Sequence, residues 1–373
     1  MKKKKIILAC TLCLLCGCSS KQPLVQEGRT VGAIVEINKD EIPDYRKGKI
    51  YSSELWKWNE DIMVDTFVSQ KQAERKATAI GISYAYEDEH ISEYLILKDG
   101  GKEFGMEEEE GGGEYGGFTY AYEDTEKGMN RIQYSYVCSG VPEREKEIML
   151  EYPKADEQDV AFMQYQEVKE ETDRLLTDIT GRELQIVNAY AVQPEIAQKK
   201  MEELNETTRE EAFGDSIWEA NDGAYMMTYN QMIDQIPVVD VLWTDRERKV
   251  GEAPYTLVTV LKNGNGLVEI DALGLHTLTD KGEEKELISF EQALDVIKKK
   301  YEYVTKKTVV TEAKMCYIAV QTDVRFHYQL LPTWLFTVEQ ERERMVGTES
   351  VLMTMTEYVA VNAVTGEIAG LNG

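Results

Sequence analysis

Histidine is scarce in this chain of 373 residues, and the three that occur stand far apart. None belongs to a His-Glu-x-x-His motif, and there is no paired-cysteine zinc motif, P-loop, Rossmann glycine pattern or Gly-x-Ser-x-Gly. We therefore expect no catalytic residue, no cofactor and no bound metal, although an enzyme with scattered catalytic residues stays open. The histidines are His90, His276 and His327, and we interpret His327 as a strand or turn residue.

Cysteine is also rare, with six residues, three of which lie within the first 17 positions. Beyond Cys18, only Cys138 and Cys316 remain, which excludes a disulfide-rich scaffold. Two alternatives stay open for this pair: one disulfide bond, or two separate buried thiols. Apolar neighbours indicate that Cys316 lies in a core.

Positive charge is in short supply, because 42 Lys and Arg stand against 68 Asp and Glu, a net charge of −26. Binding to nucleic acid requires Lys and Arg that neutralise phosphates, so we exclude a nucleic-acid partner. The same balance argues against a body that lies flat on an anionic membrane leaflet.

No apolar run approaches the roughly 20 residues that span a bilayer. The longest one near the N-terminus, Ile6–Leu15, follows four lysines and has the length of a signal-peptide core. It ends in Leu15-Cys16-Gly17-Cys18, which resembles the lipobox of diacylglyceryl-modified bacterial lipoproteins. The resemblance implies that residues 1–17 are removed, that Cys18 carries the lipid (diacylglycerol, palmitate) and that residues 18–30 form a tether. The protein is then expected on the extracytoplasmic face of the cell membrane; an ordinary secretory signal is the alternative.

Aromatic and β-branched alternation predicts a β-rich N-terminal domain over 31–155. Strands are expected near 55–58, 62–64 and 93–97, the last followed by a turn at 99–101. A tyrosine motif recurs at 82–88, 118–124 and 132–136. The tyrosines could form a sugar- or peptide-binding face, but we expect one packed face of an antiparallel sheet.

Between these strands, residues 105–117 combine carboxylates with glycines. Such a segment could bind Ca²⁺, yet it lacks the alternating Asp/Asn spacing that surrounds one ion. We expect a solvated loop.

Helical periodicity begins near residue 156, and we assign 156–373 to an α+β domain with a subdomain split near 245. An apolar stripe predicts a helix that ends before Gly181. A strand over 183–192, a second helix around 196–204 and a strand–turn–strand unit over 225–239 follow. The first stripe comprises Ala161, Tyr165, Val168, Thr172, Leu175 and Ile179.

The segment Asn263-Gly-Asn-Gly266 predicts a hairpin between strands 255–261 and 267–273, because its turn positions favour positive φ. Glu269 and Asp271 lie two residues apart and share a strand face. They could form a catalytic carboxylate pair, but we expect a solvated face, since no partner group is evident.

The clearest helix begins after Ser289, which forms a capping box with Gln292 and precedes an apolar stripe that ends at Tyr301. Strands over 309–320, 330–339 and 357–363 follow, with a turn at 365–366. One helix before antiparallel strands predicts a helix lying across a sheet. The expected fold class is α+β, with two lobes, antiparallel sheets and helices packed on one face.

Six segments of the C-terminal part, about 220–370, together carry a family resemblance: 231–238, 287–290, 293–294, 314–317, 331–336 and 358–368. In these segments the chain resembles the regulatory proteins YycH and YycI and, more loosely, PepSY-type modules of protease propeptides. It is also similar to lipoproteins of Clostridia-type Gram-positive bacteria. The resemblance implies fold more than function. YycH and YycI reach a sensor kinase through a transmembrane helix, where this chain has the lipobox-like motif.

We therefore expect a non-enzymatic, lipid-anchored binding or regulatory module whose partner is an envelope protein or peptide. Two alternatives remain from other classes: an extracytoplasmic hydrolase with an unrecognised carboxylate site, and a small-ligand or sugar-binding lipoprotein.

Overall fold

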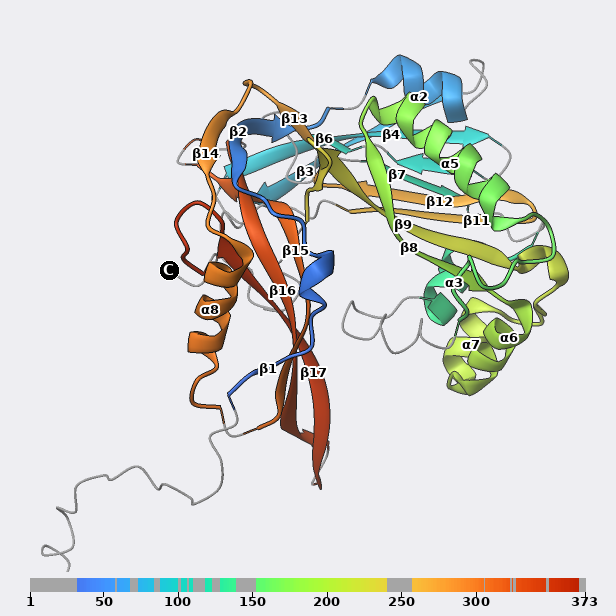
Figure 1. Cartoon of the computed structure of the whole chain (residues 1–373). Coiled ribbons are helices and arrows are strands. Elements are labelled where there is room, and N and C mark those ends of the chain that lie inside the picture. The colour runs from blue at the N-terminus through green and yellow to red at the C-terminus, as the bar shows by residue number, and fades with distance from the viewer. Residues whose placement is uncertain are drawn as a thin grey trace, which may run out of the picture.

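The fold is α+β and is built on two large, mainly antiparallel sheets in two lobes (Figure 1). The computed structural model describes the residues given at the end of this paragraph, and at some of these positions the backbone alone. Cys18, the tether, residues 106 and 110–117 of the expected loop, and the expected subdomain split near 245 lie outside the described residues. Where the loop expected at 105–117 is described, the expectation is wrong, because Gly105 ends one strand and Glu107–Glu109 form another that pairs within the sheet. The described ranges are 32–57, 59–67, 73–83, 88–99, 102–105, 107–109, 118–122, 128–138, 152–239, 257–304, 306–322, 324, 327–346 and 349–368.

The first sheet has seven strands and joins the two ends of the described chain. Its order is β1-β15-β16-β2-β13, while β14 pairs with β2 and β17 pairs with β16. All pairs are antiparallel except β1 with β15. The strands are β1 Ile34–Val35, β2 Lys47–Leu55, β13 His276–Leu278, β14 Glu283–Glu286, β15 Thr308–Gln321, β16 His327–Val346 and β17 Glu349–Asn362.

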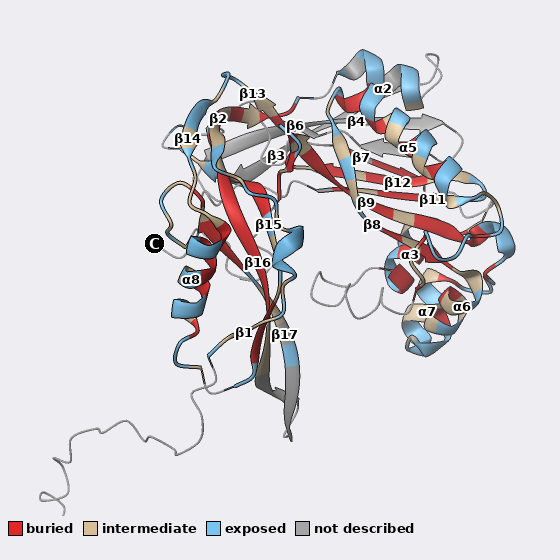
Figure 2. Cartoon of the chain, viewed as in Figure 1, coloured by how far each residue is buried: buried red, intermediate tan, exposed pale blue. Residues whose placement is uncertain are grey.

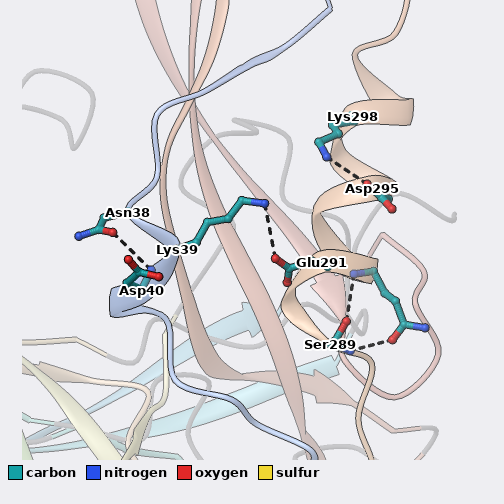
Figure 3. Close-up of polar contacts among 8 residues, drawn as sticks. Asn38, Lys39, Asp40, Ser289, Glu291, Asp295 and Lys298 are labelled. Atoms are coloured by element: carbon teal, nitrogen blue, oxygen red, sulfur yellow. Dashed lines mark hydrogen bonds and ion pairs between the residues drawn. The ribbon is translucent and has the colours of Figure 1, made fainter.

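Helix α8, Phe290–Lys300, packs on one face of this sheet, which confirms the expected helix-on-sheet unit (Figure 2). The capping box is present, since Ser289 and Gln292 exchange backbone–side chain hydrogen bonds of 3.2 and 2.9 Å (Figure 3). Phe290 lies against Trp334 and Phe336, with ring centroids 5.7 and 6.0 Å away.

The second sheet has ten strands, in the order β10-β9-β11-β12-β7-β5-β4-β3, with β6 paired to β4 and β8 paired to β9. The predicted hairpin is confirmed as β11 and β12, with Asn263 opposite Gly266. The strands are β3 Ala73–Ser83, β4 Asp88–Asp99, β5 Lys102–Gly105, β6 Glu107–Glu109, β7 Phe118–Tyr122, β8 Leu184–Val192, β9 Ala224–Ile233, β10 Ile236–Pro237, β11 Leu257–Asn263 and β12 Gly266–Leu273.

Helices pack on both faces of the ten-stranded sheet. Alternate residues of β9 face opposite ways: Tyr225 and Met227 lie in a core with α2 and α5, whereas Ala224 lies in a core with α3 and α6. We expected helices on only one face of each sheet, and α8 on the seven-stranded sheet follows that pattern. The helices are α2 Glu60–Phe67, α3 Arg131–Cys138, α5 Tyr165–Thr180, α6 Pro194–Glu203 and α7 Glu206–Ala212. Short 3-10 turns are η1 Lys39–Glu41 and η3 Ala220–Asp222.

Two expected strands, 62–64 and 132–136, are wrong, because these residues lie in α2 and α3. Both helices begin at an asparagine cap: Asn59 Oδ1 accepts from the Ile62 backbone at 3.2 Å, and Asn130 exchanges two bonds with Gln133. In α3 the buried Tyr134 and Val137 have helical spacing. The strand expected at 55–58 is also wrong; β2 ends at residue 55.

The helices and strands expected after residue 156 are confirmed as α5, β8, α6 and the β9–β10 hairpin. Ala161 of the expected apolar stripe is an exception, because α5 begins only at Tyr165 and Ala161 lies in a turn before it. Gly181 ends α5 in the left-handed conformation, with φ of 61°. In both sheets, however, strands that precede the expected domain boundary between 155 and 156 pair with strands that follow it. β2 belongs to the sheet of the C-terminal strands, and β7 pairs with β12.

Gly181 and Gly282 both have positive φ, 61° and 75°, so substituting each by alanine gives a matched test of the packing around β2. Gly181 has open space where a Cβ would lie, so we expect Gly181→Ala to cost only backbone strain, about 1 kcal/mol. Gly282 has φ of 75°, and a Cβ there would lie 2.5 Å from Cε1 of the buried Tyr51. We expect Gly282→Ala to lower the free energy of unfolding by about 3 kcal/mol, measured by urea denaturation. Equal losses in the two variants would contradict this packing.

Candidate functional site

The two sheets meet where the β9–β10 hairpin of one sheet reaches the other sheet. The turn residues Asp234 and Gln235 both have positive φ, 49° and 62°, as the two central residues of a tight hairpin turn require. The chain then continues along β15, where the Val239 amide donates to the Tyr317 carbonyl at 3.0 Å. This contact region, called the junction below, is formed by Lys49, Tyr51, Ser53, Gln231, Ile233, Asp234, Ile236, Val238, His276 and Tyr317.

A polar cluster of Lys49, Tyr51 and Asp234 lies at the rim of the junction. The Tyr51 hydroxyl donates a short hydrogen bond to Asp234 Oδ2, and Lys49 Nζ lies 3.1 Å from that hydroxyl and 3.3 Å from the carboxylate. The bond from Tyr51 lowers the pKa of Asp234, while burial raises the pKa of Tyr51. Bonds to Tyr51 and Asp234 raise the pKa of Lys49. Each pKa moves away from neutrality, so the cluster fixes the hairpin rather than exchanging protons.

His276 occupies the interior of the junction and is fully buried. The Gln231 amide binds both backbone groups of His276, at 2.8 and 2.9 Å, and so ties β9 to β13. Nδ1 lies 3.1 Å from Ser53 Oγ, and the ring meets Tyr328 edge-on at 5.3 Å. Nε2 is buried without a hydrogen-bond partner. Burial lowers the pKa of His276 to about 3, so the imidazole is neutral and weakly basic near pH 7.

The Ser53–His276 pair does not have the arrangement of a nucleophile and its base. Ser53 is 1% exposed, and among the residues that the structure describes no carboxylate bonds to the imidazole of His276. A substrate would have to reach a serine in the packed interior. We therefore assign the pair a structural role in holding β2 against β13.

Arg182 lies directly after α5 and links that helix to β13. Its Nη2 donates to Thr277 Oγ1 at 2.6 Å, whereas Nε is buried without a partner. Burial lowers the pKa of Arg182. The guanidinium therefore joins the two lobes through a neutral acceptor and not through an ion pair.

The carboxylates Glu269 and Asp271 were expected on a solvated face, and for Glu269 this is wrong. Its side chain is 19% exposed and lies 2.7 Å from Arg131 Nε, a residue of α3. Burial raises the pKa of Glu269 and Arg131 opposes that shift. The ion pair could not be read from the sequence, because the sequence predicts a strand in place of α3.

Both cysteines of the folded body are free and buried, which decides between the two alternatives left by the sequence. Burial raises the pKa of Cys138 and of Cys316 to about 12. Each thiol is therefore protonated and unreactive near neutral pH. The expectation that Cys316 lies in a core is confirmed, since it packs with Leu335 and Ala360.

The remaining histidines and the tyrosine motif do not converge on one site. His327 opens β16 as an exposed residue, with Nδ1 3.5 Å from Glu54, and His90 lies in β4. Tyr120 and Tyr134 are buried, and the Tyr134 hydroxyl donates to the Asp222 carbonyl at 2.6 Å. Tyr84 and Tyr86 lie outside the described residues. Where the side chains are described, the repeated tyrosines come from a strand and a helix and form no shared face.

Within the described part of the chain, no group of three or more His, Cys, Asp or Glu side chains is placed to hold a metal ion. No helix in the same residues is both long enough and apolar enough to cross a membrane.

The chain matches no protein-family model and no curated protein. Its fold is similar to that of an uncharacterized protein from Eubacterium rectale ATCC 33656, whose crystal structure has a resolution of 1.45 Å. The superposition has a TM-score of 0.60 at 12% sequence identity and covers 91% of this chain and 90% of that one. At this identity the similarity shows a shared fold over nearly the whole length and carries no function.

The buried His276 predicts a specific dependence of stability on pH. Because folding lowers its pKa from 6.5, its contribution is complete above pH 6.5 and is lost as pH falls toward about 3. We expect this group to remove roughly 3 kcal/mol of unfolding free energy between about pH 7 and pH 4. Urea denaturation across this range measures it.

The pH dependence of the unfolding free energy is compared in two variants. His276→Phe removes the buried histidine, and His327→Gln removes an exposed one. Over the same pH range, His276→Phe should show a shallower loss of stability than both the unaltered chain and His327→Gln. An unchanged slope in His276→Phe would contradict a buried, neutral His276.

Proposed function

We propose that the protein is an extracytoplasmic lipoprotein, held on the cell membrane through Cys18, that acts as a non-enzymatic binding or regulatory module. The lipobox residues 15–18 and the lysine-rich start of the chain support the anchor. A two-chain lipid gives far more stable membrane attachment than one chain.

The observation that carries the non-enzymatic part is the state of the reactive side chains. Cys138 and Cys316 have pKa values raised to about 12, His276 has one lowered to about 3, and Ser53 is buried. Catalytic groups are normally tuned toward the working pH and reach a cleft. In this fold the pKa values of the two thiols and of His276 are shifted away from neutral pH, and all four side chains are buried.

The broad sheets and the resemblance of residues 220–370 to YycH, YycI and PepSY-type modules support a partner that is an envelope protein or peptide. A hydrolase would need an acid pair open to substrate, whereas Glu269 is bound by Arg131. A sugar receptor would need exposed tyrosines on one face, whereas Tyr120 and Tyr134 are buried.

The anchor predicts a clear difference between two neighbouring cysteines. Cells that express the full chain with Cys18→Ala should incorporate no palmitate analogue into it, because the acceptor thiol is gone. The matched variant Cys16→Ala should be labelled as strongly as the unaltered chain. Labelling that persists in Cys18→Ala, or is absent from the unaltered chain, would contradict lipidation at Cys18.

The partner is tested by chemical crosslinking in intact cells, followed by affinity capture of the anchored protein. We expect one or a few envelope proteins to be enriched reproducibly with the unaltered chain. The same chain carrying Cys18→Ala should lose that enrichment, because it is no longer held at the membrane. Equal recovery from both chains, or no reproducible partner, would count against the proposal.

A further inference from the structure

A short basic segment interrupts this acidic chain at one end of the seven-stranded lobe. Residues 298–307 contain five lysines and one glutamate, in a protein of net charge −26. The segment begins in the last turn of α8 and continues to the residue before β15. Lys298, Lys299, Lys306 and Lys307 are all exposed.

Part of this positive charge is not neutralised by neighbouring acids. Lys298 bonds to Asp295 at 3.1 Å (Figure 3), and Lys300 bonds to Glu357 at 2.5 Å. Lys299 and Lys307, by contrast, make no ion pair with any residue that the structure describes. Two exposed ammonium groups therefore remain for an external anion.

An exposed aromatic residue lies between the lysines. Tyr303 is 79% exposed, the highest value among the large hydrophobic side chains described. A tyrosine with most of its ring in water gains free energy by burial in an apolar boundary while its hydroxyl stays hydrated. Tyrosine is enriched at the membrane–water interface for that reason.

The path of the N-terminal chain brings this segment close to the proposed anchor. β1 pairs in parallel with the start of β15, with Ile34 opposite Val309 and Val35 opposite Val310. Because the two strands run in the same direction, the chain before Ile34 leaves the sheet at the end where Lys307 precedes β15. Figure 1 shows the start of β1 and the loop after α8 at the same end of the lobe, away from the ten-stranded sheet.

The tether is short enough to hold this end near a bilayer. Thirteen residues separate Cys18 from Gly32. Even fully extended, a segment of that length spans no more than about 50 Å. The proposed anchor at Cys18 therefore keeps the basic end close to the bilayer surface.

The charge of the rest of the molecule favours one orientation. Residues 152–222, which include α5, α6 and α7, contain 18 acidic and 7 basic residues. These helices belong to the other lobe (Figure 1). An anionic leaflet repels that lobe and attracts each lysine near its surface by about 1 kcal/mol.

We propose that residues 298–307 form a membrane-contact segment that binds the anionic lipid headgroups of the bilayer to which the protein is anchored. Lys299 and Lys307 lie at the phosphates and Tyr303 enters the interface. The anchored body then stands on this end, with the acidic helices directed away from the membrane. The proposal rests on the proposed anchor at Cys18.

The test holds the chain on vesicles without using Cys18. Residues 19–373 contain every described element, and a histidine tag placed before residue 19 binds a nickel-chelating lipid. The vesicles are phosphatidylcholine, with or without phosphatidylglycerol, and carry an acceptor dye on the headgroups. A donor dye is attached through Glu302→Cys beside Tyr303, or through Asp215→Cys in the acidic lobe. Native thiols do not compete, because both are buried.

We expect energy transfer from position 302 to exceed that from position 215 several-fold on phosphatidylglycerol vesicles, and the difference to shrink in high salt. Adding Lys299→Glu and Lys307→Glu should reduce transfer from position 302. The matched pair Lys199→Glu and Lys281→Glu, which reverses exposed lysines elsewhere, should not.

Equal transfer from the two positions, or transfer from position 302 that ignores phosphatidylglycerol and salt, would overturn the proposal. Both comparisons use chains that keep Lys299 and Lys307, so they remain valid even if a charge-reversed variant folds poorly. Palmitate labelling at Cys18 is a separate measurement; if only the labelling fails, the anchor is wrong and the vesicle result still stands.

Discussion

The arrangement of the two sheets depends on one insertion, in which apolar residues of the β9–β10 hairpin are buried in the core of the seven-stranded sheet. Ile233, Ile236 and Val238 are at most 7% exposed there and pack with Tyr51 and Tyr317. Burial of each such side chain contributes about 1.5–3 kcal/mol. The exposed ion pair of Lys49 with Asp234 contributes less, because water screens the attraction between charges at the surface. The hydrophobic insertion therefore holds the lobes together, and the polar contacts fix its register.

The same insertion explains why two polar side chains of the junction are shielded from solvent. Ser53 in β2 and His276 in β13 lie on paired strands and are at most 1% exposed. The charges on the surface are unevenly distributed. The helices of one lobe carry an excess of negative charge, whereas the segment 298–307 of the other lobe is basic, so charge is distributed asymmetrically over the molecule. In the proposed anchored state the attachment lies beside the basic end, so this charge distribution would orient the body at a membrane.

Features set by neighbouring residues could be predicted from the sequence, whereas those set by distant residues could not. The capping box of Ser289 and the turn at Asn263–Gly266 depend on local chemistry, and both are confirmed. Helix α3 carried an equally local signal in Asn130 and Gln133, but the alternating tyrosines gave a competing strand pattern. The pairing of β2 with β13 and the contact of Arg131 with Glu269 join residues far apart in the chain. Periodicity contains no information about such partners.

The central claim is that the β9–β10 insertion makes the two sheets one cooperative unit. Amide hydrogen exchange at increasing urea concentration, read separately for β15–β17 and for β8–β12, tests it most directly. We expect both groups of strands to lose protection at the same urea concentration, because neither core is complete without the hairpin. Loss of protection in one group at clearly lower urea, while the other stays protected, would contradict it.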